Sequence, residues 1–590
     1  MCGICGEYRT DGTLPDTRAV GAMAEALAPR GPDGNGNFSQ RNVAFAHRRL
    51  KIIDLSEASH QPMIDSALGL VVVYNGILYN YKELRKELQD KGYSFFSHGD
   101  TEVLLKAYHA WGKDCVKRFH GMFAFALWER DSGRMILGRD RLGIKPLYFS
   151  SSGGRFRFAS SLPALVAGGQ VDTSIDPVAL HHYMTFHAVV PPPHTIFQGV
   201  RKLPPGHLME IYPDGSQKME PYWSLSYART KEDEVCDEVE WKERVMEALK
   251  TAVRRRLVAD VPVGVLLSGG LDSSLIVSLL SELGQSGLNT FSVGFEAAGG
   301  ELGDEFEYSD LIAKTFSTDH HKIFVQTEEV LPNLMRCVEA MSEPMVSHDN
   351  IGFFLLSREV AKSLKVVQSG QGADEVFGGY FWYPPLLDTE DPVADYSKLF
   401  FDRTHEEYGT AVHHKYVTED HSLAFLQKRF GETDAVCGTD KALWMDTTVM
   451  LVDDPVKRVD NMTMAWGLEA RVPFLDHELV ELAARIPPAL KIKDGGKGIL
   501  KDVGRDILPH KVIDRPKGYF PVPALKYIQG EYLDFVREVF SQTAAQQRAL
   551  FKKPYLDQLF ENPEAHITPL QGSKLWQMAL LEMWLQVHQK

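Results

Sequence analysis

The chain begins with two cysteines, Cys2 and Cys5, in a C-x-x-C spacing. This spacing is typical of redox pairs and of half a zinc site, but no second C-x-x-C or nearby histidine pair supplies the other ligands of a tetrahedral site. Cys2 has a different use, because removal of Met1 would give it a free α-amine beside its thiol. A thiolate is a strong nucleophile, and an α-amine with a pKa of about 7.7–8 can act as its general base. The position of Cys2 therefore favours nucleophilic catalysis, whereas Cys5 is expected in a buried strand.

A second candidate site is the loop SGGLDSS at residues 268–274, which directly follows the apolar run VGVLL. Its small residues let backbone N–H groups approach an anion, and the start of the next helix adds positive potential. It is not a Walker A sequence, because no lysine follows the glycines. The loop resembles the pyrophosphate-loop motif of ATP pyrophosphatases, which release pyrophosphate and form an adenylate. We expect a phosphate site here, at the carboxyl edge of a parallel sheet, with Asp272 as a Mg²⁺ ligand.

A second glycine-rich loop lies in the segment KVVQSGQGADEVFGGY at residues 365–380, again after an apolar strand. Asp374 in this loop is the candidate for a second Mg²⁺ ligand beside Asp272, because a polyphosphate chain commonly needs more than one cation contact. The two loops together predict a site for ATP and Mg²⁺.

The elements that must position these residues differ between the two halves of the chain. Strand-rich segments separated by Gly, Asp and Asn fill about the first 200 residues, with helical spacing at residues 81–92 and 101–114. This half is expected to fold as an α+β layered domain. From about residue 240 helices alternate with buried strands, which predicts a parallel doubly wound sheet, and beyond about residue 385 helices dominate. The charged run at residues 229–241 is expected to be a solvated linker leading into a helix.

Composition excludes several classes of protein. The chain has 590 residues, 44% hydrophobic and 24% charged, as in a globular protein of several domains. Its formal net charge of −15 argues against a nucleic acid or an anionic membrane as partner. Six scattered cysteines suit a reducing compartment without a disulfide framework. The start of the chain does not read as a signal peptide and no run of about 18 apolar residues occurs, so we expect a cytoplasmic protein.

Ordered motifs along nearly the whole chain carry a family resemblance. The first half contains MCGICGE at 1–7, APRGPDG at 28–34, HRRLKIIDL at 47–55, NGILYN at 75–80, GMFAFALW at 121–128, GRDRLGIKPLY at 138–148 and LPPGH at 203–207. The second half contains SGGLDSS at 268–274, TFSVGFE at 290–296, VDNMTMAWGLEARVPFLDHELVE at 459–481 and IDRPKGYF at 513–520. With these motifs the chain resembles the glutamine-dependent asparagine synthetase family.

The resemblance implies two domains. Residues 1–225 would form an α+β N-terminal-nucleophile glutaminase domain of layered antiparallel sheets with helices. Residues 240–590 would form an α/β pyrophosphate-loop synthetase domain, similar to adenine nucleotide alpha hydrolases. The implied enzyme is a carbon–nitrogen ligase that takes nitrogen from glutamine and uses ATP and Mg²⁺. Ammonia would cross the domain interface through a shielded tunnel, since water would otherwise protonate it, and homodimers occur in the family.

In the first domain, the resemblance makes Cys2 the nucleophile that attacks the side-chain amide of glutamine. A γ-glutamyl thioester forms and ammonia is released. The donors that stabilise the oxyanion match the Asn75 side chain and the backbone N–H of Gly76.

The residues that hold the glutamine substrate also follow from the resemblance. Arg49 matches the arginine that binds the α-carboxylate, for which its planar fork is suited. Asp100, in the sequence GDTE, matches the aspartate that pairs with the ammonium group. The family commonly reads NGEIYN, but this chain has Ile77 in place of the glutamate, which also contacts the amine. Either Asp100 carries the amine contact alone, or glutamine binds more weakly.

In the second domain, the resemblance assigns residues to the nucleotide and to its metal. Lys517, in RPKGYF, matches a lysine that neutralises phosphate charge during adenylation and amide formation. Asp272 and Asp374 match Mg²⁺ ligands. The nucleotide-binding positions are Leu266 and Val293 at the adenosine, Ser268, Gly269, Gly270, Asp272 and Ser273 in the pyrophosphate loop, and Ser369 and Gly370 in the second loop.

The acceptor carboxylate is where the sequence departs from asparagine synthetases. They usually have an acidic residue where this chain has Gln371, and an amide cannot act as a general base at neutral pH. The segment SEPMVSHDN at residues 342–350, with FASSLPAL, FHAVVPPP and VVQSGQGADE, is more similar to the N-acetylglutaminylglutamine amidotransferases of bacterial osmolyte synthesis. That dipeptide is the leading acceptor, and aspartate is the alternative. His348 and Asp349 are candidates for dipeptide contacts, or equally for a satisfied histidine and a loop cap.

Two other classes of function are weighed against this one. A glutamine sensor or scaffold without chemistry is disfavoured, because Cys2, Asn75, Asp272, Asp374 and Lys517 are all intact. A redox or zinc protein is disfavoured by the missing ligands. Small-molecule substrates, and neither nucleic acid nor membrane, are therefore the expected partners.

Overall fold

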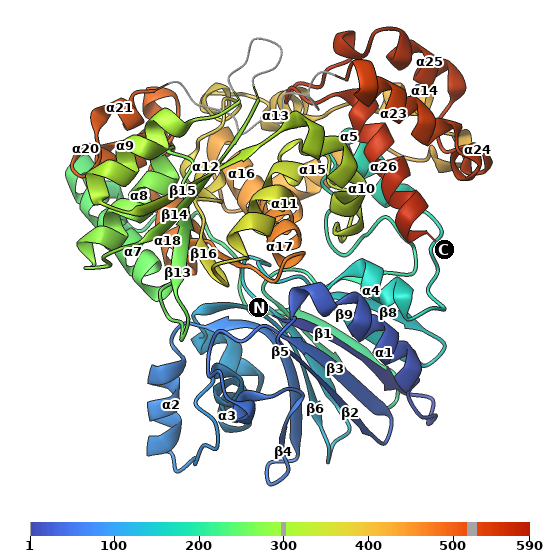
Figure 1. The fold of residues 1–590 in the computed structure, drawn as a ribbon, viewed down its shortest axis with the longest axis vertical. Coiled ribbons are helices and arrows are strands. Elements are labelled where there is room, and N and C mark those ends of the chain that lie inside the picture. The colour runs from blue at the N-terminus through green and yellow to red at the C-terminus, as the bar shows by residue number, and fades with distance from the viewer. Residues whose placement is uncertain (1, 297–302, 516–527, 590) are drawn as a thin grey trace.

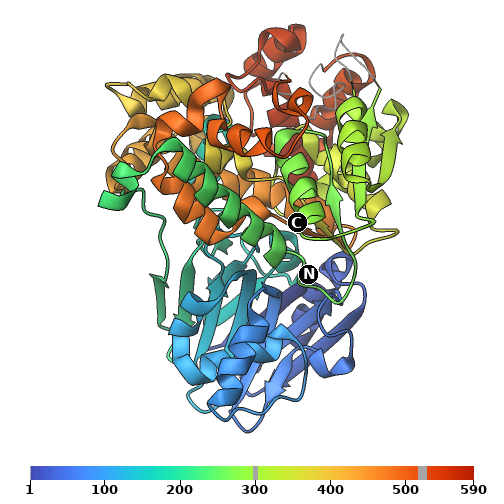
Figure 2. The same ribbon diagram turned by 90° about the vertical axis from the view of Figure 1, so that its left-hand side faces the viewer.

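The computed structural model describes residues 2–296, 303–515 and 528–589. The molecule has a smaller body rich in strands, formed by the first part of the chain, and a larger body rich in helices (Figures 1 and 2). The amino terminus lies between the two bodies. A residue at the start of the chain is therefore placed against the domain that follows it.

The first domain contains two six-stranded sheets, with orders β10-β8-β9-β1-β3-β2 and β12-β11-β7-β6-β5-β4. The strand pairs in both sheets are antiparallel. The strands are β1 (Gly3–Arg9), β2 (Gly34–Gln40), β3 (Val43–Arg49), β4 (Met63–Asp65), β5 (Leu70–Leu78), β6 (Gly121–Glu129), β7 (Met135–Arg139), β8 (Tyr148–Ser152), β9 (Arg155–Ala159), β10 (Arg201–Lys202), β11 (His207–Ile211) and β12 (Gln217–Pro221).

Helices cover the outer faces of this pair of sheets, which gives four layers (Figure 1). Alternation along β1 explains the arrangement, because Ile4 and Tyr8 pack between the sheets while Cys5 packs under the helices. The thiol of Cys5 is fully buried, 3.7 Å from the Val20 carbonyl. The predictions of an α+β layered domain and of a buried Cys5 are confirmed. The covering helices are α1 (Thr17–Ala26) and α4 (Leu162–Ala167) on the first sheet, and α2 (Tyr81–Asp90) and α3 (Asp100–Trp111) on the second.

The second domain contains a five-stranded sheet with the order β15-β14-β13-β16-β17, in which all pairs are parallel. The predicted parallel doubly wound sheet is confirmed. The chain runs from β13 outward to β14 and β15, and then returns to the other side of β13 for β16 and β17. The strand order therefore reverses between β13 and β16, and such a switch point is where these folds bind ligands. The strands are β13 (Val263–Leu266), β14 (Asn289–Phe295), β15 (Asp319–Val325), β16 (Val366–Gln368) and β17 (Glu469–Arg471).

Helices dominate the rest of the described chain, as predicted. The last, α26 (Lys574–His588), is buried over most of its length and packs on α10 and α23. No helix among the described residues combines the length and apolar character needed to cross a bilayer. The helices are α5 (Pro177–Thr185), α6 (Lys231–Val235), α7 (Glu238–Arg255), α8 (Leu271–Glu282), α9 (Phe306–Phe316), α10 (Val330–Glu339), α11 (Asp349–Val360), α12 (Ala373–Phe377), α13 (Pro392–Phe400), α14 (His405–Ala411), α15 (His421–Glu432), α16 (Gly438–Met445), α17 (Lys457–Met464), α18 (His477–Arg485), α19 (Pro488–Ile492), α20 (Gly498–Arg505), α21 (His510–Ile513), α23 (Gly530–Ser541), α24 (Thr543–Arg548) and α25 (Lys553–Glu561).

The charged run between the domains is more ordered than predicted. It contains the short helix α6, whose start is held by a capping box between Thr230 and Asp233. Asp233 is buried and pairs with Arg485 at 3.1 Å. Most of residues 229–241 are nevertheless exposed and the run leads into α7, as the expectation of a solvated linker requires. Only the order around α6 was not predicted, and it comes from local capping and from a partner distant in sequence.

Candidate active sites

Cys2 lies at the start of β1 in a pocket of about 430 Å³, including its mouth. The pocket brings together four residues that the sequence predicts, namely Cys2, Arg49, Gly76 and Asp100. Its wall is completed by Glu469, from β17 of the second domain. The thiol therefore sits where the two domains meet.

The side chain of Asn75 is bonded to the backbone of Cys2. The Cys2 nitrogen donates a hydrogen bond to Asn75 Oδ1 at 3.0 Å, which orients the amide. The Nδ2 atom of Asn75 is buried and has no hydrogen-bond partner among the described residues. A buried N–H group without a partner costs about 1–3 kcal/mol, so it calls for an explanation. An oxyanion in the pocket would satisfy it.

Gly76 follows on β5 and lines the same pocket. A Cβ at this position would lie 2.3 Å from the Met122 carbonyl oxygen on β6, closer than any side chain tolerates. Only glycine lets the two strands approach here, and its backbone then remains open to the pocket. The local sheet thus explains why Asn-Gly occurs at this point of the strand.

The Cys2 thiol is 8% exposed, and burial raises its pKa. Arg49 lowers that pKa and Glu469 raises it. A thiol in this state is protonated at neutral pH and is a weak nucleophile. The site therefore needs a base that takes the proton from Sγ.

Opposite charges flank the pocket. Arg49 donates a hydrogen bond from Nη1 to the Ser56 carbonyl at 2.8 Å, which anchors its guanidinium. Asp100 accepts hydrogen bonds from the Tyr74 hydroxyl and the Leu78 amide, both at 3.0 Å. Burial raises the pKa of Asp100 to about 6, although these hydrogen bonds oppose the shift. One cation and one carboxyl group on the same pocket suit a zwitterionic amino acid.

Ile77 lines the pocket with an apolar side chain at the position where the family commonly has glutamate. Sequence reasoning missed Glu469, although the motif GLEARVPFLD was recognised. Glu469 is 1% exposed and pairs with Arg471 at 2.6 Å. Burial would raise the pKa of Glu469, but Arg471 and Lys145 hold it at about 2. The approach of Glu469 to Cys2 depends on how the domains pack, so no local signal in the sequence could reveal it.

A buried ionic network continues from Cys2 into the domain interface. Asp460 on α17 pairs with Arg30 at 2.8 Å and with Lys145 at 2.9 Å, and Arg30 Nε lies 3.4 Å from the Cys2 carbonyl. Asp460 also lines a second cavity, of about 260 Å³ with its mouth, together with Tyr148. Lys202, Asp453 and Lys457 lie on the same wall.

The second site forms at the carboxyl ends of β13 and β16, as predicted from the two loops. Gly269 has φ +76°, and a Cβ there would lie 2.5 Å from the Ser309 nitrogen, so glycine is required. Ser268 Oγ lies 3.2 Å from Ser273 Oγ across the first loop. A Cβ on Gly370 would lie 3.0 Å from the Cβ of Asp272, so the two loops are in contact.

Lys497, which sequence reasoning missed, joins the two loops. Its Nζ lies 2.7 Å from Asp272 Oδ2 and 2.9 Å from Asp374 Oδ1. Although burial opposes the charged form, these carboxylates raise the pKa of Lys497. Its backbone has φ +54°, in the left-handed region, after Gly495 and Gly496 with positive φ. The sequence GGK could have suggested such a turn, but not that it reaches the two aspartates.

The other predicted residues lie in or just after β13, β14 and β16, except for Lys517. Leu266 ends β13, Val293 lies in β14, and Ser369 donates its backbone N–H to the Arg471 carbonyl at 2.8 Å. Lys517 lies outside the described residues. Arg515, two residues earlier, pairs with Glu305 at 3.0 Å and lies beside the first loop.

Comparisons with known proteins agree with this two-domain arrangement. The family model of asparagine synthase matches residues 244–586, and the model of the glutamine amidotransferase domain matches residues 1–223. The chain is 31% identical to asparagine synthetase [glutamine-hydrolyzing] 1 of Bacillus subtilis, over 99% of this chain and 96% of the relative. It is 32% identical to asparagine synthetase [glutamine-hydrolyzing] 3 of the same organism, over 95% and 93%. Amidase chry2 of Gibberella zeae is 29% identical over 84% of each chain. The chain thus belongs to the asparagine synthase family of ATP-using, glutamine-dependent carbon–nitrogen ligases.

Proposed function

We propose that this protein releases ammonia from glutamine at Cys2 and uses it to amidate an adenylated carboxylate, with N-acetylglutaminylglutamine as the acceptor. The observation that carries the proposal is the pocket in which Cys2, Gly76 and the charges of Arg49 and Asp100 meet. Next to it, Asn75 bonds to the Cys2 nitrogen and keeps a buried Nδ2 without a partner among the described residues. Glu469 of the second domain completes this pocket, which favours transfer of a product across the interface.

In the first reaction, the α-amine of Cys2, freed by removal of Met1, takes the proton from Sγ. The thiolate attacks the side-chain amide carbon of glutamine, and Asn75 Nδ2 and the Gly76 N–H stabilise the oxyanion. Ammonia leaves, and water hydrolyses the thioester to glutamate. Arg49 and Asp100 hold the α-carboxylate and ammonium of the substrate.

The ammonia passes along the domain interface. We place the path between the Cys2 pocket and the second cavity, with Asp460 on its wall. Buried side chains along this route exclude bulk water, and this keeps ammonia in its neutral, nucleophilic form. Cytoplasmic location and a homodimeric state stay predictions.

In the second reaction, the acceptor carboxylate attacks the α-phosphate of ATP and pyrophosphate leaves. Ammonia then attacks the carbonyl carbon of the adenylate, so that the amide forms, AMP leaves and one proton is released. The Ser268–Ser274 loop and the start of α8 bind the phosphates with backbone N–H groups and hydroxyls. Asp272 and Asp374 offer carboxylate oxygens from facing loops, which is the donor set that Mg²⁺ prefers. When bound there, Mg²⁺ would offset charge on the polyphosphate. Lys497, and Lys517 from the segment not described, would neutralise the pyrophosphate as it forms.

Two features of the sequence support the dipeptide as the acceptor. Gln371 replaces the usual acidic residue, and the SEPMVSHDN segment matches the dipeptide-amidating branch. Within this segment Asp349 lies 3.4 Å from Arg458 on α17, and burial raises the pKa of Asp349 to about 6. Arg458 also lies near Tyr380, at the end of the segment that carries the second loop. Arg458 is thus our candidate for holding a carboxylate of the acceptor.

Aspartate is the second candidate acceptor. The similarity to curated asparagine synthetases at 31–32% identity favours it. The Asp349–Arg458 pair could also receive the ammonium and carboxylate of an amino acid.

A purified-enzyme assay tests the proposal. The full chain, with Met1 removal checked by mass spectrometry, receives glutamine, Mg-ATP and either acceptor. AMP, pyrophosphate and glutamate formed in equal amounts only with N-acetylglutaminylglutamine would support it. Pyrophosphate release that depends on aspartate but not on the dipeptide would replace the dipeptide with aspartate. Formation of ADP instead of AMP would contradict the adenylation step itself.

A further inference from the structure

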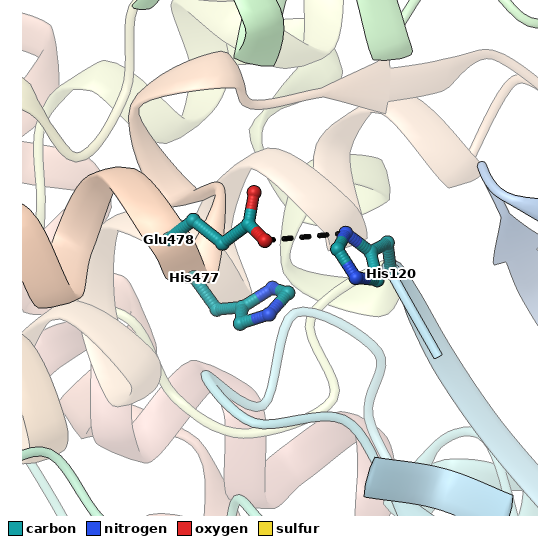
Figure 3. A group of neighbouring side chains, drawn as sticks. All are labelled: His120, His477 and Glu478. Carbon is teal, nitrogen blue, oxygen red and sulfur yellow. Dashed lines mark ion pairs between the residues drawn. The ribbon is translucent and has the colours of Figure 1, made fainter. Parts of the chain in front are cut away.

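Two groups of histidine and acidic side chains outside the proposed active sites stand close enough to hold a metal ion, among the residues that the structure describes. The first group is His120, His477 and Glu478, at the contact between the two domains (Figure 3). The second is His181, His405 and Asp420. Their surroundings separate them.

Cationic neighbours disfavour a metal at the first group. Glu478 already pairs with Arg255 at 2.6 Å, and its distance to His120 is 3.9 Å. The positive charges of Arg141 and Arg255 act on His477 as well. The two imidazoles pack edge to face, with ring centres 4.9 Å apart. Figure 3 shows both rings beside Glu478. This group is therefore a packing contact between domains in a field that repels cations.

The second group has the spacing of a metal site. His181 Nε2 lies 3.0 Å from His405 Nδ1 and 3.8 Å from Asp420 Oδ1. Tetrahedral ligands at Zn²⁺ bond lengths of about 2.0–2.1 Å lie roughly 3.4 Å apart, between these two values. The ligands come from α5, the start of α14 and the residue before α15. An ion here would tie α5 to α14 and α15, two neighbouring helices more than two hundred residues later in the chain.

The hydrogen bonds behind His181 direct a lone pair toward this group. Thr185 donates its hydroxyl hydrogen to the His181 carbonyl at 2.7 Å, so it can accept the hydrogen of Ser422, also at 2.7 Å. Ser422 Oγ can then accept from His181 Nδ1 at 3.2 Å. With the proton on Nδ1, Nε2 faces His405 and Asp420 as a lone pair. Such support from behind is typical of metal-binding histidines.

Charge and access also suit a cation. His181 is 1% exposed, whereas the Asp420 side chain is 32% exposed, so the group can be reached from solvent. Asp420 supplies a negative charge that imidazoles lack.

We propose that His181, His405 and Asp420 form a site for a divalent transition-metal ion such as Zn²⁺, which fastens α5 to α14 and α15. Two imidazoles and one carboxylate select such ions over Mg²⁺, and water can occupy the fourth position. The role is structural. Two residues after α5 ends, His187 pairs with Asp402 at 3.1 Å, so the ion also anchors the segment that carries this pair.

Metal binding is tested on the full-length protein in the Cys2→Ala background, so that zinc on the nucleophile is not counted. Zn²⁺ affinity is measured by competition with a chromophoric chelator, and Co²⁺ is added to detect the absorption bands of a tetrahedral site. We expect one bound equivalent, with at least about tenfold weaker binding and no tetrahedral Co²⁺ spectrum in His405→Gln and Asp420→Asn.

The variants are chosen to keep the fold. Both side chains are partly exposed, and asparagine preserves the helix cap that Asp420 provides to α15. His414→Gln, an exposed histidine between α14 and α15, is the matched control and should bind like the parent. Equal affinity in all four proteins, or no saturable binding in the parent, would overturn the proposal and leave a His181–His405 hydrogen bond in its place.

Discussion

The pocket around Cys2 and the second candidate site, at the carboxyl ends of β13 and β16, differ in how their charged side chains are paired. In the pocket, Arg49 is anchored by a backbone carbonyl and Asp100 by a hydroxyl and an amide, so both charges remain on the wall. At the second site, Lys497 pairs directly with Asp272 and Asp374. The first site is arranged for a ligand in advance, whereas the second is closed upon itself.

The difference teaches what each ligand must do on binding. A glutamine molecule needs only to displace water from the pocket. A nucleotide with Mg²⁺ must instead separate Lys497 from the two carboxylates, after which lysine and metal can both face phosphate. Under the proposed function, binding at the second site would thus replace one set of ion pairs with another. The binding of the nucleotide would then depend on the binding of Mg²⁺, and the reverse.

The largest effect is expected from Cys2→Ala. Glutamine-dependent amidation should fall to background, as for removal of a nucleophile worth roughly 10⁶-fold, while free ammonia still supports it. Cys5→Ala is the control in the same strand and should keep both activities. Equal retention of both activities in Cys2→Ala would show that Cys2 is not the nucleophile.

Lys497→Met tests the second site, where this lysine joins Asp272 and Asp374. With the charge on the pyrophosphate no longer offset, we expect pyrophosphate release with either nitrogen source to fall by about 10³-fold. Glutamine hydrolysis measured without ATP should be unchanged. Lys501→Met, one turn later on α20, is the control. A loss confined to glutamine hydrolysis would contradict the assignment of Lys497 to the nucleotide.

Asn75→Ala tests the unpartnered amide of the pocket. The kcat for glutamine hydrolysis should fall by roughly 10²–10³-fold with little change in KM, because the oxyanion forms only in the transition state. Ammonia-dependent amidation should persist. Asn37→Ala, an exposed asparagine on β2, serves as control. A change in KM alone would assign Asn75 to substrate binding instead.

Asp100 gives the smallest effect and a pH signature. Since its pKa is raised to about 6, the carboxyl is neutral below that pH and cannot pair with the ammonium of glutamine. The KM for glutamine should therefore rise as pH falls through about 6. Asp100→Asn should raise KM by ~30-fold above about pH 7, and its KM should approach that of the wild type as pH falls below about 6. A wild-type KM that stays flat from pH 5 to about 8 would contradict this.

Stability provides an independent reading of the same group. A folded-state pKa above the unfolded value favours folding below about pH 4, and this contribution is lost as pH rises through about 6. Asp100→Asn should remove that decline in the free energy of unfolding. Chemical denaturation across this range measures it, with the surface variant Asp90→Asn as reference.

Much of the molecule could be read from local pattern. The SGGLDSS and SGQGADE loops follow buried strands, and parallel strands bring their carboxyl ends to one edge, so the meeting of Asp272 and Asp374 was predictable. Strand-rich segments separated by Gly, Asp and Asn predicted the layered first domain, and Cys5 was expected in a buried strand. The ordered helix in the linker could not be predicted, because the partner of the buried Asp233 is Arg485, more than two hundred residues away.

The sequence by itself determined which groups we propose to react: the thiol of Cys2, an Asn-Gly step in a strand, and glycine-rich loops before helices. These depend on residue type and near neighbours, through strand pleat, glycine sterics and helix ends. Only the tertiary structure decided that Glu469 closes the Cys2 pocket, that Lys497 holds the two aspartates, and that His181 meets His405 and Asp420. Such contacts join segments far apart in the chain, and packing geometry rather than local preference sets them.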